Sequence, residues 1–182
     1  MKFCSNCGSK VSLQVPAGDD RERHVCAECE TIHYQNPRII AGCLPTYEDK
    51  VLLCKRAIEP RYGLWTLPAG FMENGESTEQ GALRESWEEA RAEIHLHGLY
   101  TLFSLPHINQ VYMLFRGELA NLNFAPGIES LEVDLFTEDQ VPWDQLAFPV
   151  MHKTLRYYFA DRPRQAFPIR SETIARSKPP IG

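Results

Sequence analysis

The stretch from Gly70 to Ala92 reads G-F-M-E-N-G-E-S-T-E-Q-G-A-L-R-E-S-W-E-E-A-R-A, and the interpretation of the whole chain starts from it. The residues from about Thr78 to Ala90 predict one helix. Ser77 and Gln80 have capping-box spacing, in which each side chain bonds the backbone N–H of the other residue. The glycine-containing segment before Ser77 predicts a loop that leads into this helix.

The two sides of the predicted helix differ in chemistry. At about 100° per residue, the apolar residues Leu83, Trp87 and Ala90 fall together and predict a stripe that faces the core. On the opposite side lie Glu85, Glu88 and Glu89, whose spacings of three and four residues make their charges repel. Arg84, four residues before Glu88, offsets part of that repulsion, and a bound divalent cation would offset the rest. A solvated acidic face is the alternative interpretation.

The spacing of the charged residues resembles the Nudix box, written G-x5-E-x7-R-E-U-x-E-E-x-G-U, where U is a bulky apolar residue. The matching residues are Gly70, Glu76, Arg84, Glu85, Glu88 and Glu89, and Gly63 to Ala69 resembles the family's lead-in. Ser86 departs from the pattern where a bulky apolar residue is usual, and Ala92 is a weak final apolar residue. Arg91 replaces the glycine that ends the helix in a left-handed conformation, which would cost about 1 kcal/mol if the backbone is kept.

The resemblance implies a magnesium-dependent nucleotide pyrophosphatase in which hard oxygen ligands bind Mg²⁺ or Mn²⁺. It assigns Glu85 and Glu89 as the principal ligands, Glu88 as a further ligand, and the Ala69 carbonyl as the completion of the sphere. Arg84 and Glu76 would orient these carboxylates. The general base is left open between a box glutamate and two later ones, Glu129 and Glu132. The candidate aromatic contacts to the substrate are Tyr62, Trp65, Phe71 and Tyr112, each of which could instead pack in the core or at its rim.

Strand and helix patterns around the box predict an α/β domain. The strand-like runs are 38–46, 51–56, 94–104, 110–119 and 131–136, and 150–159 predicts a second helix. Their mixture favours an α/β/α sandwich, which in the Nudix family contains a mixed sheet. Cys43 and Cys54 lie inside the first two strands and are expected to be ordinary buried thiols. We therefore assign 36–160 to a Nudix domain and 161–182 to a loosely held, proline-containing C-terminal tail with one short strand.

The other four cysteines predict a small zinc ribbon over residues 1–35. Cys4-x2-Cys7 and Cys26-x2-Cys29 are separated by 18 residues, a spacing at which two tight turns can close a tetrahedral Cys4 site. Four sulfur ligands leave no open position on the metal, so the Zn²⁺ is expected to be structural. A redox C-x-x-C pair is the alternative.

Composition constrains the partners. The 182-residue chain has a net charge of −5, which argues against a nucleic-acid partner bound through its phosphates. No apolar run approaches the roughly 20 residues that cross a membrane, and no secretory signal is recognised, so the expected location is the cytoplasm. We expect a small nucleotide substrate, no membrane partner and, by resemblance, a homodimer.

The resemblance extends beyond the box to zinc-ribbon Nudix enzymes described as ADP-ribose pyrophosphatases and to plastid FAD pyrophosphatases. It rests on Tyr34 to Pro37, Gly63 to Gly70, Phe124 to Gly127 and Leu146 to Phe148. This implies cleavage of FAD to FMN and AMP, or of ADP-ribose. Hydrolysis of NADH or another dinucleotide is the alternative, although Phe103 to Asn109 lacks the S-Q-P-W-P-F-P-x-S motif of the NADH branch. A non-catalytic nucleotide sensor or nucleic-acid-binding adaptor is the alternative outside the enzymes.

Overall fold

The computed structural model describes residues 1–175, which form two compact units divided between Asn36 and Pro37. The first unit is a three-stranded antiparallel sheet in the order β1-β2-β3. Its strands are β1 (Val11–Gln14), β2 (Arg23–Cys26) and β3 (Ile32–His33). No helix in the described residues is long and apolar enough to span a membrane.

The second unit is built on one mixed sheet. Its strands are β4 (Arg38–Tyr47), β5 (Lys50–Arg56), β6 (Trp65–Thr66), β7 (Ala69–Phe71), β8 (Ile94–Leu105), β9 (Gln110–Leu119), β10 (Ser130–Phe136) and β11 (Arg170–Thr173). The main order is β10-β5-β4-β9-β8-β11, while β6 pairs with β5 and β7 with β4. The β4–β9 and β8–β11 pairs are parallel and the others antiparallel. The predicted strands and the mixed α/β fold are therefore confirmed.

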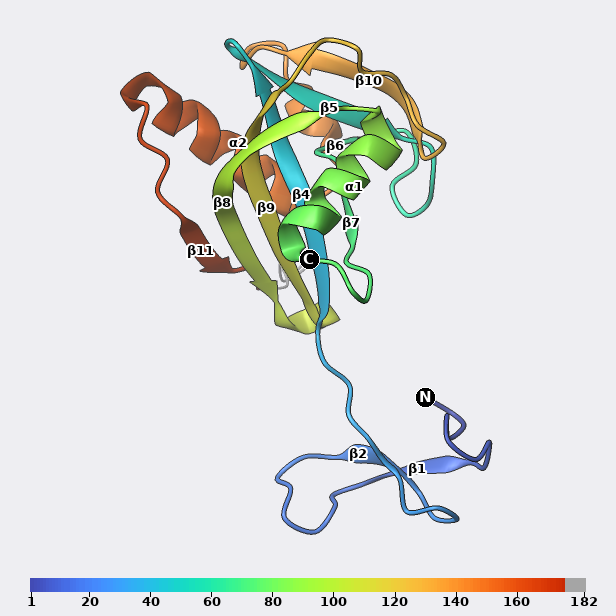
Figure 1. Cartoon of the computed structure of the whole chain (residues 1–182). Coiled ribbons are helices and arrows are strands. Elements are labelled where there is room, and N and C mark those ends of the chain that lie inside the picture. Colours follow the sequence, from blue (N-terminus) through green and yellow to red (C-terminus); the bar gives the residue numbers. More distant parts are fainter. Residues whose placement is uncertain (176–182) are drawn as a thin grey trace, which may run out of the picture. The chain divides into compact units, whose positions relative to one another are not determined.

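Helices α1 (Thr78–Ala90) and α2 (Pro149–Asp161) cover opposite faces of this sheet (Figure 1). The side chains of β4 alternate between the two faces of the sheet. Ala41 and Cys43 belong to the hydrophobic cluster on the α1 side, whereas Ile40 and Leu44 belong to the cluster on the α2 side. Three short 3₁₀ helices, Pro106–Ile108, Trp143–Gln145 and Arg162–Arg164, complete the connections. Each fully buried leucine in these layers contributes about 1.5–3 kcal/mol, so the two-sided core fixes where both helices lie.

The two cysteines in the central strands are buried, as predicted. Cys43 is fully buried and Cys54 is 1% exposed. Burial raises the pKa of Cys43 to about 12 and that of Cys54 well above its ordinary value. Both are therefore inert packing thiols.

Helix α1 begins as predicted but faces the core differently. Ser77 Oγ accepts from the Gln80 N–H at 3.2 Å, and Gln80 Oε1 accepts from the Ser77 N–H at 2.7 Å. The predicted stripe is confirmed at Ala90, which is buried, and in part at Leu83, which is partly buried against the same core. It is wrong at Trp87, which is 48% exposed. The buried face is small and polar instead: Gly81, Ala82, Glu85, Ser86, Glu89 and Ala90.

The small face lets the helix lie close to β4. The Ser86 hydroxyl satisfies its polarity by donating to the Ala82 carbonyl at 2.7 Å, and the Cys43 thiol donates to the same carbonyl at 3.4 Å. A bulky residue at position 86 is therefore not needed. The buried Ser86, which departs from the box pattern, satisfies its hydroxyl group within the helix. This packing turns two of the three box glutamates inward.

The segment after α2 is tied to the sheet over part of its length. Strand β11 pairs with β8, and the buried Asp161 carboxylate accepts from Arg170 and, at 2.8 Å, from the Tyr100 hydroxyl. The short strand expected in the C-terminal tail is therefore present at Arg170–Thr173. The rest of the predicted tail, residues 176–182, lies outside the described residues.

Arg91 adopts the conformation that a glycine would favour at the end of α1. Its φ of 51° and ψ of 25° are left-handed, and its N–H donates to the carbonyls of Ser86 and Trp87. Its guanidinium lies 5.6 Å from the Trp87 ring centroid. The left-handed helix end that is typical of the family is thus kept, although arginine is strained in this backbone conformation.

We predict that Arg91→Gly stabilises the protein by about 0.5–1 kcal/mol, because glycine accepts this backbone without a Cβ penalty. Urea unfolding measures the change. Arg91→Ala is the control, since it keeps the Cβ penalty and loses the contact with Trp87. A glycine variant no more stable than the alanine variant would contradict this account of the helix end.

Candidate functional site

The Arg84 guanidinium is the centre of the charged network on α1. It binds both oxygens of Glu76, at 3.0 and 2.9 Å, and donates to the Phe71 carbonyl at 3.1 Å. A further nitrogen donates to Glu85 at 2.8 Å and to Glu88 at 2.9 Å. The bonds between Arg84 and Glu76 lower the pKa of Glu76 to about 2, and they are also the main cause of the raised pKa of Arg84. Arg84 therefore joins the loop before the helix to two of its glutamates.

Glu85 and Glu89 point into the protein. Glu85 is 8% exposed and Glu89 is 5% exposed, whereas the Glu88 side chain is 54% exposed. Burial is the largest cause of the raised pKa of both inward carboxyls, and for Glu89 the value reaches about 8. The Glu85 charge adds to this effect on Glu89, while Arg56 and the Ala69 backbone oppose it. Two adjacent carboxylates are thus held in a region where negative charge is unfavourable.

The surroundings of these carboxylates fit a divalent cation. Glu89 Oε2 is buried and has no hydrogen-bond partner among the described residues. Strand β7 passes beside Glu85 so closely that a Cβ on Gly70 would lie 2.3 Å from its carboxylate. An unpartnered buried oxygen and a glycine that leaves room beside a second carboxylate suit a hard cation with oxygen ligands. Ala69, the other predicted ligand, lies in β7 next to Gly70.

The three box carboxylates are gathered less tightly than the zinc-ribbon cysteines. Among residues 1–175, the cysteines alone form a group of three or more metal-binding side chains whose ligand atoms all lie within 4.8 Å. Arg84 binds one oxygen of Glu85 and one of Glu88, which draws these two side chains toward its guanidinium. The structure therefore gathers Glu76, Glu85 and Glu88 around Arg84, while Glu89 is buried on the same helix face as Glu85.

The loop that contains Ala125 and Gly127 brings Glu129 toward Glu85 and Glu89. The Ala125 and Gly127 N–H groups donate to the carbonyls of Ala90 and Glu89, each at 2.9 Å. A Cβ on Gly127 would lie 1.7 Å from the Glu88 carbonyl, so only glycine permits this approach. The Glu129 charge contributes to the raised pKa of both Glu85 and Glu89. Glu132, the other late candidate for the general base, pairs with Lys55 at 3.2 Å.

Arg56 is a site residue that the sequence reasoning missed. It is 8% exposed, and its guanidinium donates to the Pro60 carbonyl at 3.0 Å. Burial raises the pKa of Glu89 and of Tyr112, and the Arg56 charge opposes that rise in both. The sequence feature that could have identified Arg56 as a site residue is its position at the end of β5, directly before the loop that leads to the box. In the described residues it has no carboxylate within ion-pair distance.

The four candidate aromatics divide by exposure. Trp65 and Tyr112 are 6% and 9% exposed and belong to the α2-side core. Tyr62 is 56% exposed, and Phe71 is 48% exposed with the Arg38 guanidinium 4.7 Å from its ring centroid. Only Tyr62 and Phe71 present ring surface to a ligand, and Phe71 follows Gly70 directly.

The cysteines of the first unit converge. Cys4 and Cys29 sulfurs lie 3.6 Å apart, and Cys7 and Cys26 sulfurs 3.5 Å apart, with all four thiols free. Tetrahedral bonds of about 2.3 Å to zinc would separate two sulfurs by about 3.8 Å, close to these distances. His33 Nε2 lies 3.3 Å from Cys4 Sγ and is a neighbour of the cluster. The geometry fits a structural Zn²⁺.

Comparisons with known proteins agree with this architecture. A family model for the Nudix N-terminal zinc ribbon matches residues 2–35, and the NUDIX domain model matches residues 36–160. The crystal structure of a Nudix hydrolase from Nitrosomonas europaea is 55% identical, with a TM-score of 0.90, over 96% of this chain and 100% of that one. An ADP-ribose pyrophosphatase from Streptococcus suis is 18% identical over 75% of this chain and 100% of that one, with a TM-score of 0.60, which shows the fold alone.

Curated relatives match in sequence as well. The NAD-capped RNA hydrolase NudC of Edwardsiella ictaluri is 30% identical over 78% of this chain and 53% of its own length. The protein of the same name from Pseudomonas aeruginosa is 29% identical over 92% of this chain and 59% of its own length. The chain thus spans between half and three fifths of these relatives. With its NUDIX domain model matched over 36–160 behind a matched zinc ribbon, the chain belongs to the Nudix hydrolase family.

Proposed function

We propose that the protein is a divalent-metal-dependent pyrophosphatase that hydrolyses the phosphoanhydride bond of a nucleoside diphosphate derivative. The observation that carries the proposal is the pair of buried carboxylates, Glu85 and Glu89, beside Gly70, with one Glu89 oxygen left without a partner. Burying two like charges is unfavourable unless a cation neutralises them. A structural or purely solvated role for the acidic helix does not account for this arrangement.

The residues that would hold Mg²⁺ or Mn²⁺ are Glu85, Glu88, Glu89 and the Ala69 carbonyl. Such an ion, when bound, neutralises the diphosphate charge and lowers the pKa of a water molecule. Arg84 fixes Glu85 and Glu88 from the side of the Glu76 loop, so that their oxygens keep one orientation. Glu129, which the Gly127 turn brings toward the inward glutamates, is proposed as the base whose carboxylate accepts the proton of the attacking water.

FAD, cleaved to FMN and AMP, and ADP-ribose remain the proposed substrates, and NADH or another dinucleotide is the second candidate. The exposed rings of Tyr62 and Phe71 offer stacking surfaces for a base or flavin ring. The connection after β8 is a short turn, Pro106–Ile108, within the segment that lacks the NADH-branch motif. The pyrophosphate is common to all these substrates, and specificity depends on the few contacts around it.

We no longer exclude a nucleic-acid partner, as the sequence analysis did. That exclusion rested on the net charge of −5, yet the relatives above are named NAD-capped RNA hydrolases. A capped RNA end presents the same pyrophosphate as a dinucleotide, so overall charge does not decide between them. We therefore include NAD-capped RNA among the candidate substrates. A homodimer is proposed from the family resemblance.

We predict that the protein with Mg²⁺ hydrolyses at least one member of a panel of FAD, ADP-ribose, NADH and NAD-capped RNA. Phosphate released by an added phosphatase measures turnover of the three small substrates, and separation of the RNA products measures the fourth. Glu89→Gln should lower turnover by about 100-fold or more, because a metal-binding oxygen is lost.

Glu79→Gln, an exposed acid in the first turn of the same helix, is the matched control and should keep wild-type turnover. A wild-type protein inactive on the whole panel, with substrate binding retained, would favour the nucleotide-sensing or adaptor function instead.

The buried Glu89 carboxyl makes stability depend on pH in the absence of divalent ions. Its folded-state pKa of about 8 lies above the ordinary 4.5, so its contribution is complete below pH 4.5 and is lost as pH rises through 8. We predict that wild type loses stability between pH 6 and about 8.5 relative to Glu89→Gln, by about 1–3 kcal/mol. Urea unfolding at the two pH values, without added magnesium, measures the difference. Parallel pH profiles for the two proteins would show that Glu89 is not in an unfavourable environment.

We propose a structural Zn²⁺ on the four cysteines of the first unit. Removal of zinc by a chelator should make residues 1–36 sensitive to protease, because the small unit has few buried apolar residues besides Cys4 and Cys26. Limited proteolysis with mass spectrometry locates the cuts, and Cys26→Ser should reproduce them. The β4–β11 unit serves as the internal control. An unchanged cleavage pattern after verified zinc loss would exclude a structural role for the metal.

A further inference from the structure

Arg56, the last residue of β5, is held in one position by the residues around it. Its Nε donates to the Pro60 carbonyl at 3.0 Å, and its guanidinium carbon lies 5.2 Å from the Phe148 ring centroid. Its backbone N–H donates to the Leu64 carbonyl and its own carbonyl accepts from the Gly63 N–H, each at 2.9 Å. Because the side chain is ordered before any ligand arrives, binding through it costs little conformational entropy.

Most of the hydrogen-bonding capacity of Arg56 is unused. A guanidinium has five N–H donors, and within residues 1–175 the Nε bond to Pro60 is the only hydrogen bond of this side chain. In the same residues, the buried side-chain nitrogens and oxygens that lack a partner are Glu89 Oε2 and Ser130 Oγ. The two terminal nitrogens of Arg56 are not among them, so both still contact solvent, although the residue is only 8% exposed. Arg56 thus presents a largely buried cation whose terminal donors are accessible to a small anion.

The acidic residues near Arg56 are not paired with it. Glu132 binds Lys55 instead, at 3.2 Å. Neither Glu89 nor Glu129 forms an ion pair with Arg56. An arginine that served only to neutralise Glu89 would be expected to bind its carboxylate directly, because a buried charge is stabilised by a bonded partner.

Backbone contacts connect Arg56 to the glutamates of α1. The Glu89 carbonyl accepts from the Gly127 N–H at 2.9 Å, and the Gly127 carbonyl accepts from the Ser130 N–H at 3.2 Å. Ser130 is the register partner of Arg56 in the β10–β5 pair, where paired residues lie about 5 Å apart. Two hydrogen bonds and one strand pair therefore link Glu89 to Arg56. The opposition of the Arg56 charge to the raised pKa of Glu89 agrees with this placement.

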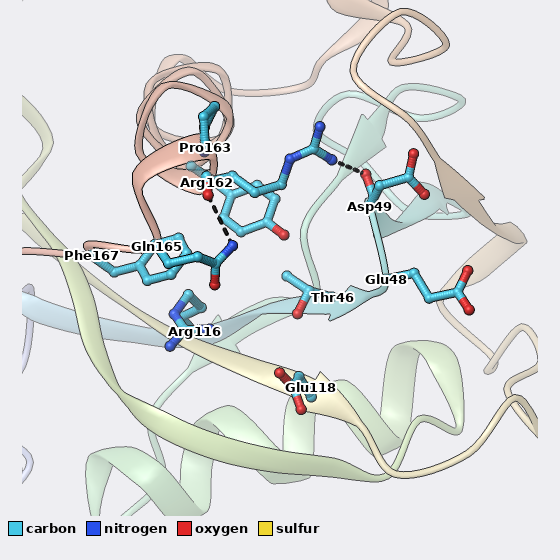
Figure 2. Close-up of a pocket in the computed structure, with 10 residues that line it drawn as sticks. Thr46, Glu48, Asp49, Arg116, Glu118, Arg162, Pro163, Gln165 and Phe167 are labelled. Carbon is cyan, nitrogen blue, oxygen red and sulfur yellow. Dashed lines mark hydrogen bonds between the residues drawn. The ribbon is translucent and has the colours of Figure 1, made fainter.

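Two other arginines, Arg116 and Arg162, line a cavity of about 550 Å³ near the segment that follows α2 (Figure 2). Arg116 lies 4.1 Å from the Phe167 ring centroid, whereas Arg162 donates to the Asp49 carbonyl. The wall of this cavity also contains three carboxylates, those of Glu48, Asp49 and Glu118. Because this mixture of charges favours neither an anion nor a cation, we assign no ligand to the cavity.

Arg56 and Glu89 are opposite charges of one site that do not bind each other. Glu89 Oε2 is buried without a partner, and the terminal donors of Arg56 have no acceptor within residues 1–175. A diphosphate bound to a divalent cation is complementary to both, since the cation suits the carboxylates and the phosphate oxygens suit the guanidinium. A free cation or a free anion would satisfy only one of the two residues.

We propose that Arg56 is a substrate-binding residue of this site, whose terminal N–H groups bind oxygens of the substrate's diphosphate. The inference rests on the proposed pyrophosphatase function. The planar pair of N–H donors matches two oxygens of one phosphate, which a lysine ammonium does not. Arg56 therefore recognises the group that all the candidate substrates share, whichever base or ring they contain.

Calorimetric titration with α,β-methylene ADP in the presence of Mg²⁺ tests the proposal. ADP is the part that FAD, ADP-ribose, NADH and an NAD cap have in common, and the methylene bridge prevents hydrolysis. Arg56→Gln should weaken binding about 10-fold or more, because charge-assisted hydrogen bonds to the phosphates are lost. Arg56→Lys keeps the charge without the planar donor pair and should have an intermediate affinity.

Two controls separate this effect from a general loss of charge. Arg61→Gln removes an exposed arginine from the same loop, residues 57–64, and should bind α,β-methylene ADP like wild type. Adenosine lacks the phosphates, so its affinity should be the same for wild type and Arg56→Gln. Urea unfolding establishes that each variant is folded at the temperature of the titration.

Mn²⁺ titration, followed by the EPR signal of the free ion, separates this inference from the proposed function. Arg56→Gln should bind Mn²⁺ at least as tightly as wild type, whereas Glu89→Gln should bind it more weakly. Wild-type affinity for α,β-methylene ADP in both Arg56 variants, or an equal loss in Arg61→Gln, would overturn the role of Arg56 while the metal site stands. The same holds for a wild type that binds Mn²⁺ but not α,β-methylene ADP. A wild type that does not bind Mn²⁺ would instead overturn the proposed function and this inference with it.

Discussion

One guanidinium organises the charged half of this protein: Arg84 binds Glu76, Glu85 and Glu88 at once. Carboxylates packed this closely repel, and the bonds from Arg84 keep them in one arrangement without a metal. Through the Phe71 carbonyl the same side chain also fixes the strand that carries Gly70 and Ala69. Glu89 has no bond to Arg84, and its burial, followed by the Glu85 charge, makes its negative charge unfavourable. A divalent cation would neutralise this charge.

The sequence predicted strands β4, β5, β8, β9 and β10, both long helices, the capping box and the residues of the Nudix box, because these depend on local periodicity and spacing. It failed on the orientation of α1, since a helical wheel assigns the core to the largest apolar residues. Here the buried face of α1 includes the small residues Ala82, Ser86 and Ala90, and Trp87 remains exposed. The sequence also did not predict that Gly127 allows its loop to approach the Glu88 carbonyl, because this contact joins backbone segments that are distant in the chain.

The cysteine cluster and the carboxylate site lie in different units of the fold. The cysteine cluster closes a small unit of its own, while α1 and the strands beneath it build the carboxylate pair. On the other face, α2 and the segment after it are tied to the sheet by the bonds that Asp161 accepts from Arg170 and Tyr100. Because β4 contributes to both faces, the alternation of its side chains packs α1 and α2 on opposite sides of the sheet.

Glu85 and Glu89, beside Ala69 and Gly70, are the proposed ligands of the divalent ion. Paramagnetic broadening of amide NMR signals by substoichiometric Mn²⁺ tests this assignment most directly, because Mn²⁺ accepts the same oxygen ligands as Mg²⁺ and broadens only nearby nuclei. The signals of residues 69–71 and 85–89 should broaden first, and excess Mg²⁺ should restore them. Broadening centred on another part of the β4–β11 unit, with the signals of 69–71 and 85–89 unchanged, would show that these two glutamates do not bind the ion.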